Sequence, residues 1–367
     1  MNYKLKDIIE FNRKSTKSAS FGRKDGLYPF FTSSNEVSKF SDEYDYDAEA
    51  LIIGDGGTGN CKYYKGKFSA SDHNYVLTSK NKQVPLKLIH YFLMKDNYKI
   101  LNDGFRGVGI KNISKTYIGD IDFSYNSAYT IDEITAALDS INSIIASKQD
   151  EIIHLDDLIK SRFIEMFGDP IDNPYGWDLK PLLSLGECKN GMNFRNDEQG
   201  VDIHCLGVGD FKNLSIVDDI TQLPIVSLNC MPSSEYLLKD GDIVFVRSNG
   251  NKALVGRSIA IYPKETNTTF SGFCIRFRKK SEEINTYYLL QVFKVDSTRR
   301  KMAGRGANIQ NLNQQILASL NIPIPPIELQ NDYEAFVKLI DKSKFSVQKE
   351  IDLYQELLDK KMNEYFG

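Results

Sequence analysis

Several features that define membrane, secreted or metal-binding proteins are missing from this 367-residue chain. No run of eighteen apolar residues occurs, which argues against a membrane-spanning helix, and the charged N-terminal stretch does not resemble a signal peptide. The five cysteines are scattered and form no C-x-x-C pair, so neither a disulfide framework nor a zinc site is expected. The sequence therefore predicts a cytoplasmic globular protein without a metal site.

Sequence signatures of catalysis are also scarce, with one apparent exception. The stretch LIIGDGGTGN (51–60) places the pattern G-x-G-x-x-G after a short apolar run. A dinucleotide-binding site needs a helix directly after these glycines, because the pyrophosphate lies at the N-terminus of that helix. Here the glycines lead into NCKYYKGKFSAS (60–71), whose alternation is typical of a hairpin strand. We therefore expect no bound cofactor.

Charge is nearly balanced over the whole chain but unevenly distributed. The net charge of −3 gives no indication of a nucleic-acid partner. Residues 130–167 carry eight acidic and three basic side chains, whereas residues 239–301 carry six acidic and thirteen basic ones. Residues 1–30 are also basic, with seven basic and three acidic side chains. The basic segments are compatible with contacts to phosphate groups.

The chain contains an internal repeat with an offset of 199 residues. Aligning GFRGVGIKNISKTYIGDIDF (104–123) with AGRGANIQNLNQQILASLNI (303–322) places Arg106 on Arg305. The same offset continues without a gap to the end of the chain. The sequence is therefore one unit duplicated, and each copy is a variable globular part followed by a similar C-terminal segment.

Both C-terminal segments are predicted to be long helices, because their apolar residues recur at the heptad steps of a coiled coil. Thr130 and Glu133 predict a capping box at the start of the first helix, and Gly168 with Pro170 predicts its end. Matched lengths favour pairing of the helices with each other over packing of each on its own domain. The two predicted seams comprise Ile131, Ile134, Leu138, Ile141, Ile145, Lys148, Ile152, Leu155 and Ile159 in one helix, and Tyr333, Val337, Ile340, Lys344, Val347, Ile351, Tyr354 and Leu358 in the other.

These patterns predict an α+β fold in four consecutive parts. Two globular domains rich in short β-like runs cover residues 1–129 and 169–326, and two long helices cover residues 130–168 and 327–367. The helices are predicted to pair as an antiparallel coiled coil, which gives the repeat pseudo-two-fold symmetry. Such symmetry suits a DNA duplex that is read at two separated half-sites.

The order of variable domain, helix, variable domain and helix resembles the specificity (S) subunit of type I DNA restriction–modification systems, over the whole chain. Three stretches are similar to that family: NLNQQILASLNIPIPPIELQ (311–330), NPYGWDLKPLLSLGE (173–187) and LLKDGDIVFVR (237–247). The helices that end in Phe-Gly are similar too. One departure is that the lead-in to the first helix, IDFSYNSAYTIDEI (121–134), lacks the prolines and the glutamine of the second.

The resemblance implies a non-catalytic subunit in which each globular part is a target recognition domain that reads half of a bipartite duplex DNA sequence. The paired helices would set the unread spacer and dock two modification subunits, which carry S-adenosylmethionine and methylate adenine N6. Restriction subunits would join to cleave unmethylated DNA. The acidic faces of the helices would then be protein-docking surfaces, and no membrane is involved.

Basic and polar residues in turns are the candidates for DNA contacts, because Arg and Asn make bidentate hydrogen bonds to guanine and adenine edges. Arg106 and Arg305 lie in the element that both copies share, so they suit phosphate anchoring better than base reading. The candidates in the first domain are Arg23, Lys24, Ser33, Ser34, Asn35, Lys62, His73, Arg106 and Lys111. Those in the second domain are Arg195, Lys212, Arg247, Ser248, Asn249, Lys252, Arg257, Arg305 and Asn308.

Two alternatives remain open at this point. The chain could be the specificity partner of a fused type II restriction–methylation enzyme, which differs in the partner chain. It could also be a coiled-coil scaffold that binds proteins but no DNA, although the basic character of residues 239–301 argues mildly against that.

Overall fold

The computed structural model describes residues 2–80, 84–109, 111–195, 197–211, 215–251, 253–303 and 311–367. Contacts divide the chain into two compact units: unit 1 is Met1–Glu151 with Val347–Gly367, and unit 2 is Ile152–Ser346. Each of the two long helices therefore contributes one part to unit 1 and the other part to unit 2. Four predicted DNA contacts lie outside the described residues, namely Lys212, Lys252, Arg305 and Asn308.

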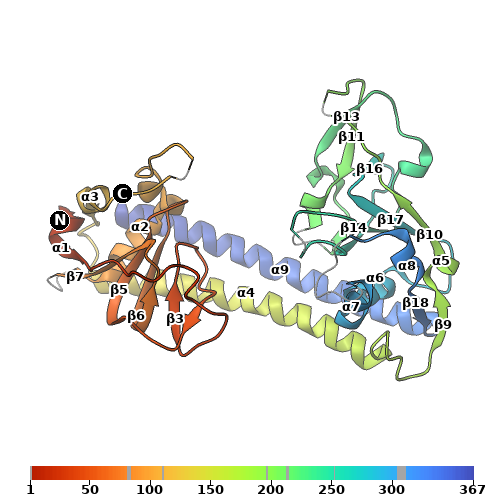
Figure 1. The fold of residues 1–367 in the computed structure, drawn as a ribbon, viewed down its shortest axis with the longest axis horizontal. Helices are drawn as coiled ribbons and strands as arrows, with labels where there is room; N and C mark the ends of the chain where they lie inside the picture. The colour runs from red at the N-terminus through yellow and green to blue at the C-terminus, as the bar shows by residue number, and fades with distance from the viewer. Residues whose placement is uncertain are drawn as a thin grey trace. The chain divides into compact units, whose positions relative to one another are not determined.

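Unit 1 is built on a six-stranded sheet with the strand order β2-β7-β5-β6-β3-β4. Helix α2 (Leu86–Asn102) packs on β5 and β6 (Figure 1). Buried aromatic rings such as Phe31 and Phe68 pack against each other in the core of this unit. Helix α2 is kinked where Asp96, Asn97 and Tyr98 adopt positive φ angles. The strands are β2 (Ile9–Phe11), β3 (Tyr28–Phe31), β4 (Phe40–Ser41), β5 (Tyr46–Gly54), β6 (Cys61–Ala70) and β7 (Asn74–Ser79).

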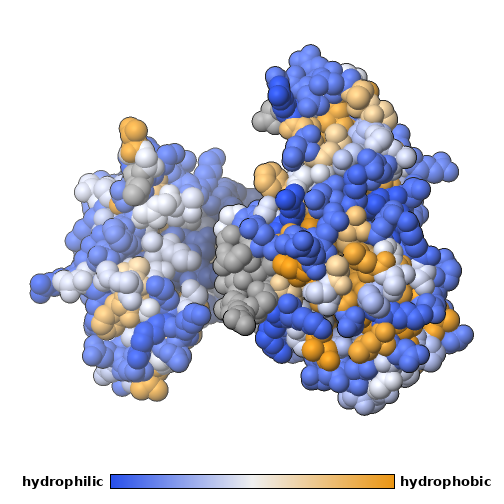
Figure 2. Space-filling model, turned by 45° about the vertical axis from the view of Figure 1, so that its right-hand side comes forward, coloured by the Kyte–Doolittle hydropathy of each residue, from blue (hydrophilic) through white to orange (hydrophobic). Residues whose placement is uncertain are grey.

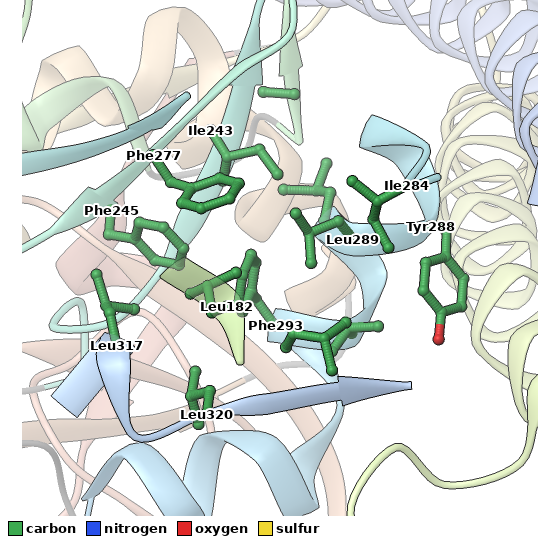
Figure 3. Packing of buried hydrophobic residues seen from close by; sticks show 14 of the residues in the cluster. Leu182, Ile243, Phe245, Phe277, Ile284, Tyr288, Leu289, Phe293, Leu317 and Leu320 are labelled. Carbon is green, nitrogen blue, oxygen red and sulfur yellow. The ribbon is translucent and has the colours of Figure 1, made fainter. Parts of the chain in front are cut away.

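Unit 2 is built on a five-stranded sheet with the order β10-β17-β14-β15-β12 and carries a second, three-stranded sheet with the order β13-β11-β16. Helix α6 (Thr286–Lys294) covers the larger sheet, where Phe245 and Phe293 meet edge to face at 4.8 Å between ring centroids (Figure 3). The strands are β10 (Gly186–Asn190), β11 (Val201–Leu206), β12 (Ile216–Val217), β13 (Ile225–Leu228), β14 (Asp242–Val246), β15 (Ser258–Ile261), β16 (Thr268–Phe270) and β17 (Cys274–Lys279).

The repeat extends through the globular domains. The series β2-β7-β5-β6-β3 and β10-β17-β14-β15-β12 have the same order, with three antiparallel pairings followed by one parallel pairing. Each unit also has a two-stranded antiparallel sheet, β1-β8 or β9-β18. The predicted α+β class with an internal repeat is therefore confirmed, and the three-stranded sheet is an addition in unit 2.

Short elements connect these sheets, and each copy has its own set. Unit 1 contains β1 (Asn2–Lys4), α1 (Leu5–Ile8), α3 (Lys115–Asp120) and β8 (Asp122–Ser124). Unit 2 contains β9 (Asp178–Pro181), α5 (Leu182–Leu185), α7 (Asp296–Ala303), α8 (Gln314–Ala318), β18 (Asn321–Ile324) and the 3₁₀ turns Val208–Phe211, Ile220–Gln222 and Ser234–Tyr236.

The two long helices are α4 (Ile131–Phe167) and α9 (Ile327–Phe366). Thr130 and Glu133 form the predicted capping box, since Thr130 N donates to Glu133 Oε2 (2.8 Å) and Glu133 N donates to Thr130 Oγ1 (3.2 Å). Gly168, at φ +75°, follows the last turn of α4. Among the helices of the described residues, none combines the length and hydrophobicity needed to cross a bilayer.

Helices α4 and α9 pair in both units, and the predicted seam residues are largely buried at the contact. In unit 1, Lys148 Nζ pairs with Glu350 at 2.9 Å. In unit 2, Lys344 Nζ pairs with Asp156 at 2.6 Å, and Tyr333 Oη donates to Ile159 O at 3.4 Å. In unit 2 the partner numbers fall in α9 as they rise in α4, so the pairing there is antiparallel. In unit 1, Tyr129 just before α4 contacts Glu364 near the end of α9, which together with Lys148 and Glu350 gives the same direction. The finer coiled-coil geometry stays a prediction.

The side chain of Gln330, the glutamine in the lead-in to α9, holds the start of this helix in place. It is fully buried; its Oε1 accepts from Asn285 N (2.8 Å), and its Nε2 donates to Pro325 O (2.7 Å) and Glu283 O (3.0 Å). These bonds fix the start of α9 to the start of α6.

Replacing Gln330 by leucine is expected to lower the free energy of unfolding by about 1–3 kcal/mol, because it leaves buried backbone groups unpaired. Urea denaturation measures the change. The control is Gln348→Leu on the exposed face of the same helix, where we expect a change within about 0.5 kcal/mol. Equal effects of the two substitutions would contradict the assigned role of Gln330.

Candidate nucleic-acid interface

The Gly-rich loop of unit 1 lies between β5 and β6 and is clamped by backbone hydrogen bonds from two sides. Asp55 N donates to His73 O at 3.0 Å, and Ile113 N donates to Asp55 O at 2.9 Å. Gly57 N donates to Lys111 O at 3.1 Å. The loop is therefore fixed by the residue that precedes β7 and by the segment that follows α2.

Close packing explains the glycines of this loop. A Cβ atom at Gly54 would lie 3.1 Å from Ser33 Cα, and one at Gly59 would lie 3.0 Å from Asn102 N. Gly57 has a φ angle of +93°, which favours glycine. The loop leads into strand β6, as the alternating pattern predicted, and the glycines allow a tight turn at this position.

Asp55 holds two exposed side chains at the edge of the loop. Its side chain is only 11% exposed; the carboxylate forms an ion pair with Lys14 Nζ and lies 3.2 Å from His73 Nδ1. The Lys14 ammonium also lies 4.5 Å from the centroid of the Tyr75 ring. A buried acid thus positions one cation and one imidazole at the surface.

Lys62 links the Gly-rich loop to the loop that follows β3. Its Nζ donates to Thr32 O (3.2 Å) and to Asn60 Oδ1 (2.8 Å), and Asn60 Nδ2 donates to Ser33 O (3.0 Å). Burial lowers the pKa of the Lys62 ammonium to about 8. These bonds give Lys62 a structural role, and its predicted contact with DNA stays a prediction.

Arg106 and Lys111 lie on the segment that clamps the loop, and both are exposed. Arg106 and Asn112 exchange two backbone hydrogen bonds of 2.9 Å each, which form an antiparallel bridge. The structure thus brings together Ser33, Lys62, His73, Arg106 and Lys111 around one loop.

The turn after β14 forms the corresponding surface of unit 2. Arg247 N donates to Phe273 O at 2.8 Å, and Leu312 N donates to Arg247 O at 2.9 Å. The Arg247 side chain is exposed, and its Nη1 lies 3.5 Å from Gly272 O. The Phe273 side chain is 60% exposed beside it.

The neighbouring candidates of unit 2 shape the same turn. Ser248 N donates to Phe273 O at 3.4 Å, and Asn249 Oδ1 accepts from Asn251 N at 2.7 Å. Arg257 Nη1 donates to Phe211 O at 3.4 Å. The structure therefore places Arg247, Ser248 and Asn249 together.

The remaining candidates have few contacts that define a role. Arg23 is paired with Asp42, and Arg195 is exposed. Ser34 Oγ accepts from Glu36 N at 3.3 Å in the loop that follows β3. Lys24 and Asn35 are exposed. DNA contacts by these five residues (Arg23, Lys24, Ser34, Asn35 and Arg195) stay predictions.

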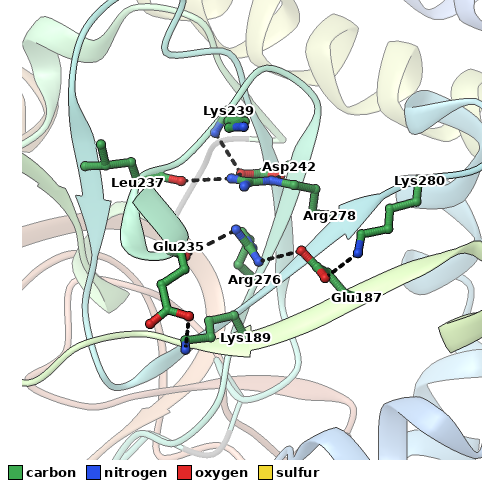
Figure 4. A network of polar contacts seen from close by, with 9 residues as sticks. All are labelled: Glu187, Lys189, Glu235, Leu237, Lys239, Asp242, Arg276, Arg278 and Lys280. Atoms are coloured by element: carbon green, nitrogen blue, oxygen red, sulfur yellow. Dashed lines mark hydrogen bonds and ion pairs between the residues drawn. The ribbon is translucent and has the colours of Figure 1, made fainter. Parts of the chain in front are cut away.

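A polar network on β10, β17 and β14 supports the second domain (Figure 4). Arg278 Nε and Nη2 donate to the two carboxylate oxygens of Asp242 at 2.8 and 2.7 Å. Arg276 is 2% exposed and donates to Glu235 O at 3.3 Å, and burial lowers the pKa of its guanidinium. Arg276 and Arg278, two of the basic residues in the segment 239–301, thus form hydrogen bonds within the domain.

Sequence reasoning did not select three residues of these surfaces: Lys14, Asp55 and Phe273. Lys14 and Asp55 are 41 residues apart in the chain, and their contact has no sequence pattern. Within the described ranges, no group of three or more His, Cys, Asp or Glu side chains is placed to hold a metal ion.

Two related α+β domains with clamped surface loops, each continued by a long helix, define a duplicated two-domain protein. Residues 1–155 and 174–353 match the family model described as the type I restriction modification DNA specificity domain. The chain therefore belongs to the type I restriction–modification DNA specificity family.

Similar proteins cover nearly the whole chain. The EcoDI specificity subunit of Escherichia coli is 23% identical over 384 residues, which cover 96% of this chain and 84% of that protein. A type I specificity subunit of Mycoplasma pneumoniae is 21% identical and covers 97% of this chain and 96% of that protein. The crystal structure of an S subunit from M. genitalium shares the fold, with a TM-score of 0.57, 14% identity and coverage of 100% and 96%. The interpretation as a type I specificity subunit is confirmed over the alternatives.

Proposed function

We propose that this chain reads a bipartite DNA sequence, one half with each unit, and itself carries no catalytic group. The observation that supports the proposal most strongly is the repeated loop clamp. In each unit, a turn after the central strand of the sheet is fixed by the same two backbone hydrogen bonds and presents polar side chains. Equivalent turns on duplicated domains suit two half-sites of one duplex.

Within each surface, we assign different tasks to different side chains. Arg106 and Lys111 are exposed on the segment shared by both copies, so they suit phosphate contacts that position the domain. Arg247 and His73 lie on the parts that differ between the copies, so they suit contacts with base edges.

The long helices are proposed to dock two modification subunits, which would carry S-adenosylmethionine and methylate adenine N6. Leu158 in unit 2 and Leu357 in unit 1 are equivalent under the 199-residue repeat and are 46% and 39% exposed. Exposed leucines at equivalent positions suit two copies of one partner. Figure 2 shows hydrophobic patches interspersed with hydrophilic surface on the face of unit 2 that it presents.

Restriction subunits are proposed to join this assembly and to cleave DNA that lacks the methyl mark. The chain would then act in the cytoplasm, together with its DNA and its partner subunits. This chain would therefore supply recognition of the DNA sequence, whereas its partner subunits would supply the catalysis.

Selection from a pool of randomised duplexes tests the proposal. The chain, assembled with its modification subunit, is expected to enrich duplexes with two short fixed segments separated by a gap of constant length. Enrichment of one contiguous segment, or no enrichment over the modification subunit alone, would contradict recognition by two units.

A further inference from the structure

The loop clamps of the two units correspond residue by residue. Gly54 pairs with Asn74 across β5 and β7, and Val246 pairs with Cys274 across β14 and β17. The residue that follows β5 is therefore equivalent to the residue that follows β14. Likewise, the residue that precedes β7 is equivalent to the residue that precedes β17. This equivalence places Asp55 on Arg247, and His73 on Phe273.

The hydrogen bonds confirm this equivalence. Asp55 N and Arg247 N donate to His73 O and Phe273 O at 3.0 and 2.8 Å. Asp55 O and Arg247 O both accept at 2.9 Å, from the backbone N–H groups of Ile113 and Leu312. Ile113 and Leu312 are themselves 199 residues apart, which is the offset of the repeat. The backbone frame is thus the same, while the side chains that it presents are different.

The two side-chain pairs differ in the groups that they expose. In unit 2, the exposed groups are the Arg247 guanidinium, which is a donor only, and the Phe273 ring. In unit 1, the Asp55 carboxylate is buried and His73 is exposed. A carboxylate only accepts hydrogen bonds, so the hydrogen between Asp55 Oδ1 and His73 Nδ1 is carried by the ring. In the neutral ring, Nε2 is then an acceptor.

We propose that this pair of equivalent positions determines which base each unit reads, an inference that rests on the proposed function. Arg247 donates to the O6 and N7 acceptors of a guanine in the half-site of unit 2. His73 accepts through Nε2 from the amino group of an adenine or a cytosine in the half-site of unit 1. Asp55 is a positioning residue that fixes the ring of His73, and Phe273 supplies apolar contact beside Arg247.

The test is to map the methylated motif in cells that produce the modification subunit with either the wild-type chain or a variant. Arg247→Ala is expected to reduce the preference for guanine at one position of one half-site by about tenfold to a hundredfold. His73→Ala is expected to relax one adenine or cytosine position in the other half-site. Each variant leaves the opposite half-site unchanged.

Asp55 is tested by two substitutions that separate positioning from folding. Asp55→Ala is expected to relax the same base position as His73→Ala, whereas Asp55→Asn keeps an oxygen acceptor for Nδ1–H and preserves the preference. Thermal melting shows whether either variant is unfolded, and the His73→Ala result stands independently of both. Lys160→Ala, at an exposed position of α4 that faces away from Leu158, is the control and is expected to leave both half-sites unchanged.

The outcomes separate this inference from the proposed function. If the wild-type motif is bipartite and stays intact in Arg247→Ala and His73→Ala, the inference about these positions is overturned, while the proposed function stands. The inference is also overturned if both variants relax the same half-site. Absence of a bipartite motif for the wild-type chain overturns the proposed function itself.

Discussion

Insertion of seven residues into α4 alone is expected to abolish sequence-specific methylation, whereas matched insertions in α4 and α9 restore it with a longer spacer. The insertion points are after Glu151 in α4 and after Ser346 in α9, where the chain passes between the two units. One heptad adds about 10.5 Å to a helix, and B-form DNA rises about 3.4 Å per base pair. The spacer is therefore expected to grow by up to about three base pairs.

The single insertion is expected to disrupt the pairing of α4 with α9 along their apolar seam. It leaves the apolar seam positions of the extra heptad without partners on the other helix, and it breaks the alignment of Lys148 with Glu350 or of Lys344 with Asp156. The matched pair keeps both alignments, because a heptad preserves the face of the helix within about 20°. Motif mapping measures the outcome; an unchanged spacer in the doubly extended chain would show that the helices do not set it.

Replacing Leu158 or Leu357 by glutamate is expected to remove one modification subunit from the complex, and the double variant is expected to bind none. Losing a buried leucine costs about 1.5–3 kcal/mol of binding free energy, and desolvating a carboxylate adds several more. The affinity at each altered site should therefore fall by about a thousandfold or more. Native mass spectrometry of the mixed subunits counts the copies bound.

The matched control uses Gln149 and Gln348, which are also exposed and equivalent under the repeat. Each lies nine residues from the corresponding leucine, which is about half a turn around the helix. Glutamate at these positions should leave two copies bound. If Leu158→Glu and Leu357→Glu also retain two copies, the proposed docking surface is wrong.

The sequence was sufficient to predict the architecture, because heptad spacing and a gapless repeat are properties of order along the chain. The seam residues from Ile134 to Ile159 and the capping box at Thr130 follow directly from that order. The repeat within the domains could not be found in this way, because its offset changes from 192 residues between Asp55 and Arg247 to 200 between His73 and Phe273. These positions share no side chains, so the strand pairings were needed to align them.

The details of the interface could not be predicted, because they depend on contacts between distant segments. Asp55 appeared to be part of a glycine motif, yet it pairs with Lys14 from the N-terminal segment. Lys62 and Arg276 appeared to contribute free positive charge, yet both are engaged internally. Counting basic residues gives the charge of a segment, but only the fold shows which of those charges face outward.

The most direct test of the account is to map adenine methylation in the genome of cells that produce the proposed modification subunit with and without this chain. The account predicts a bipartite motif with an unread gap of fixed length, present only when the chain is produced. A contiguous motif, or methylation that is the same without the chain, would contradict the account.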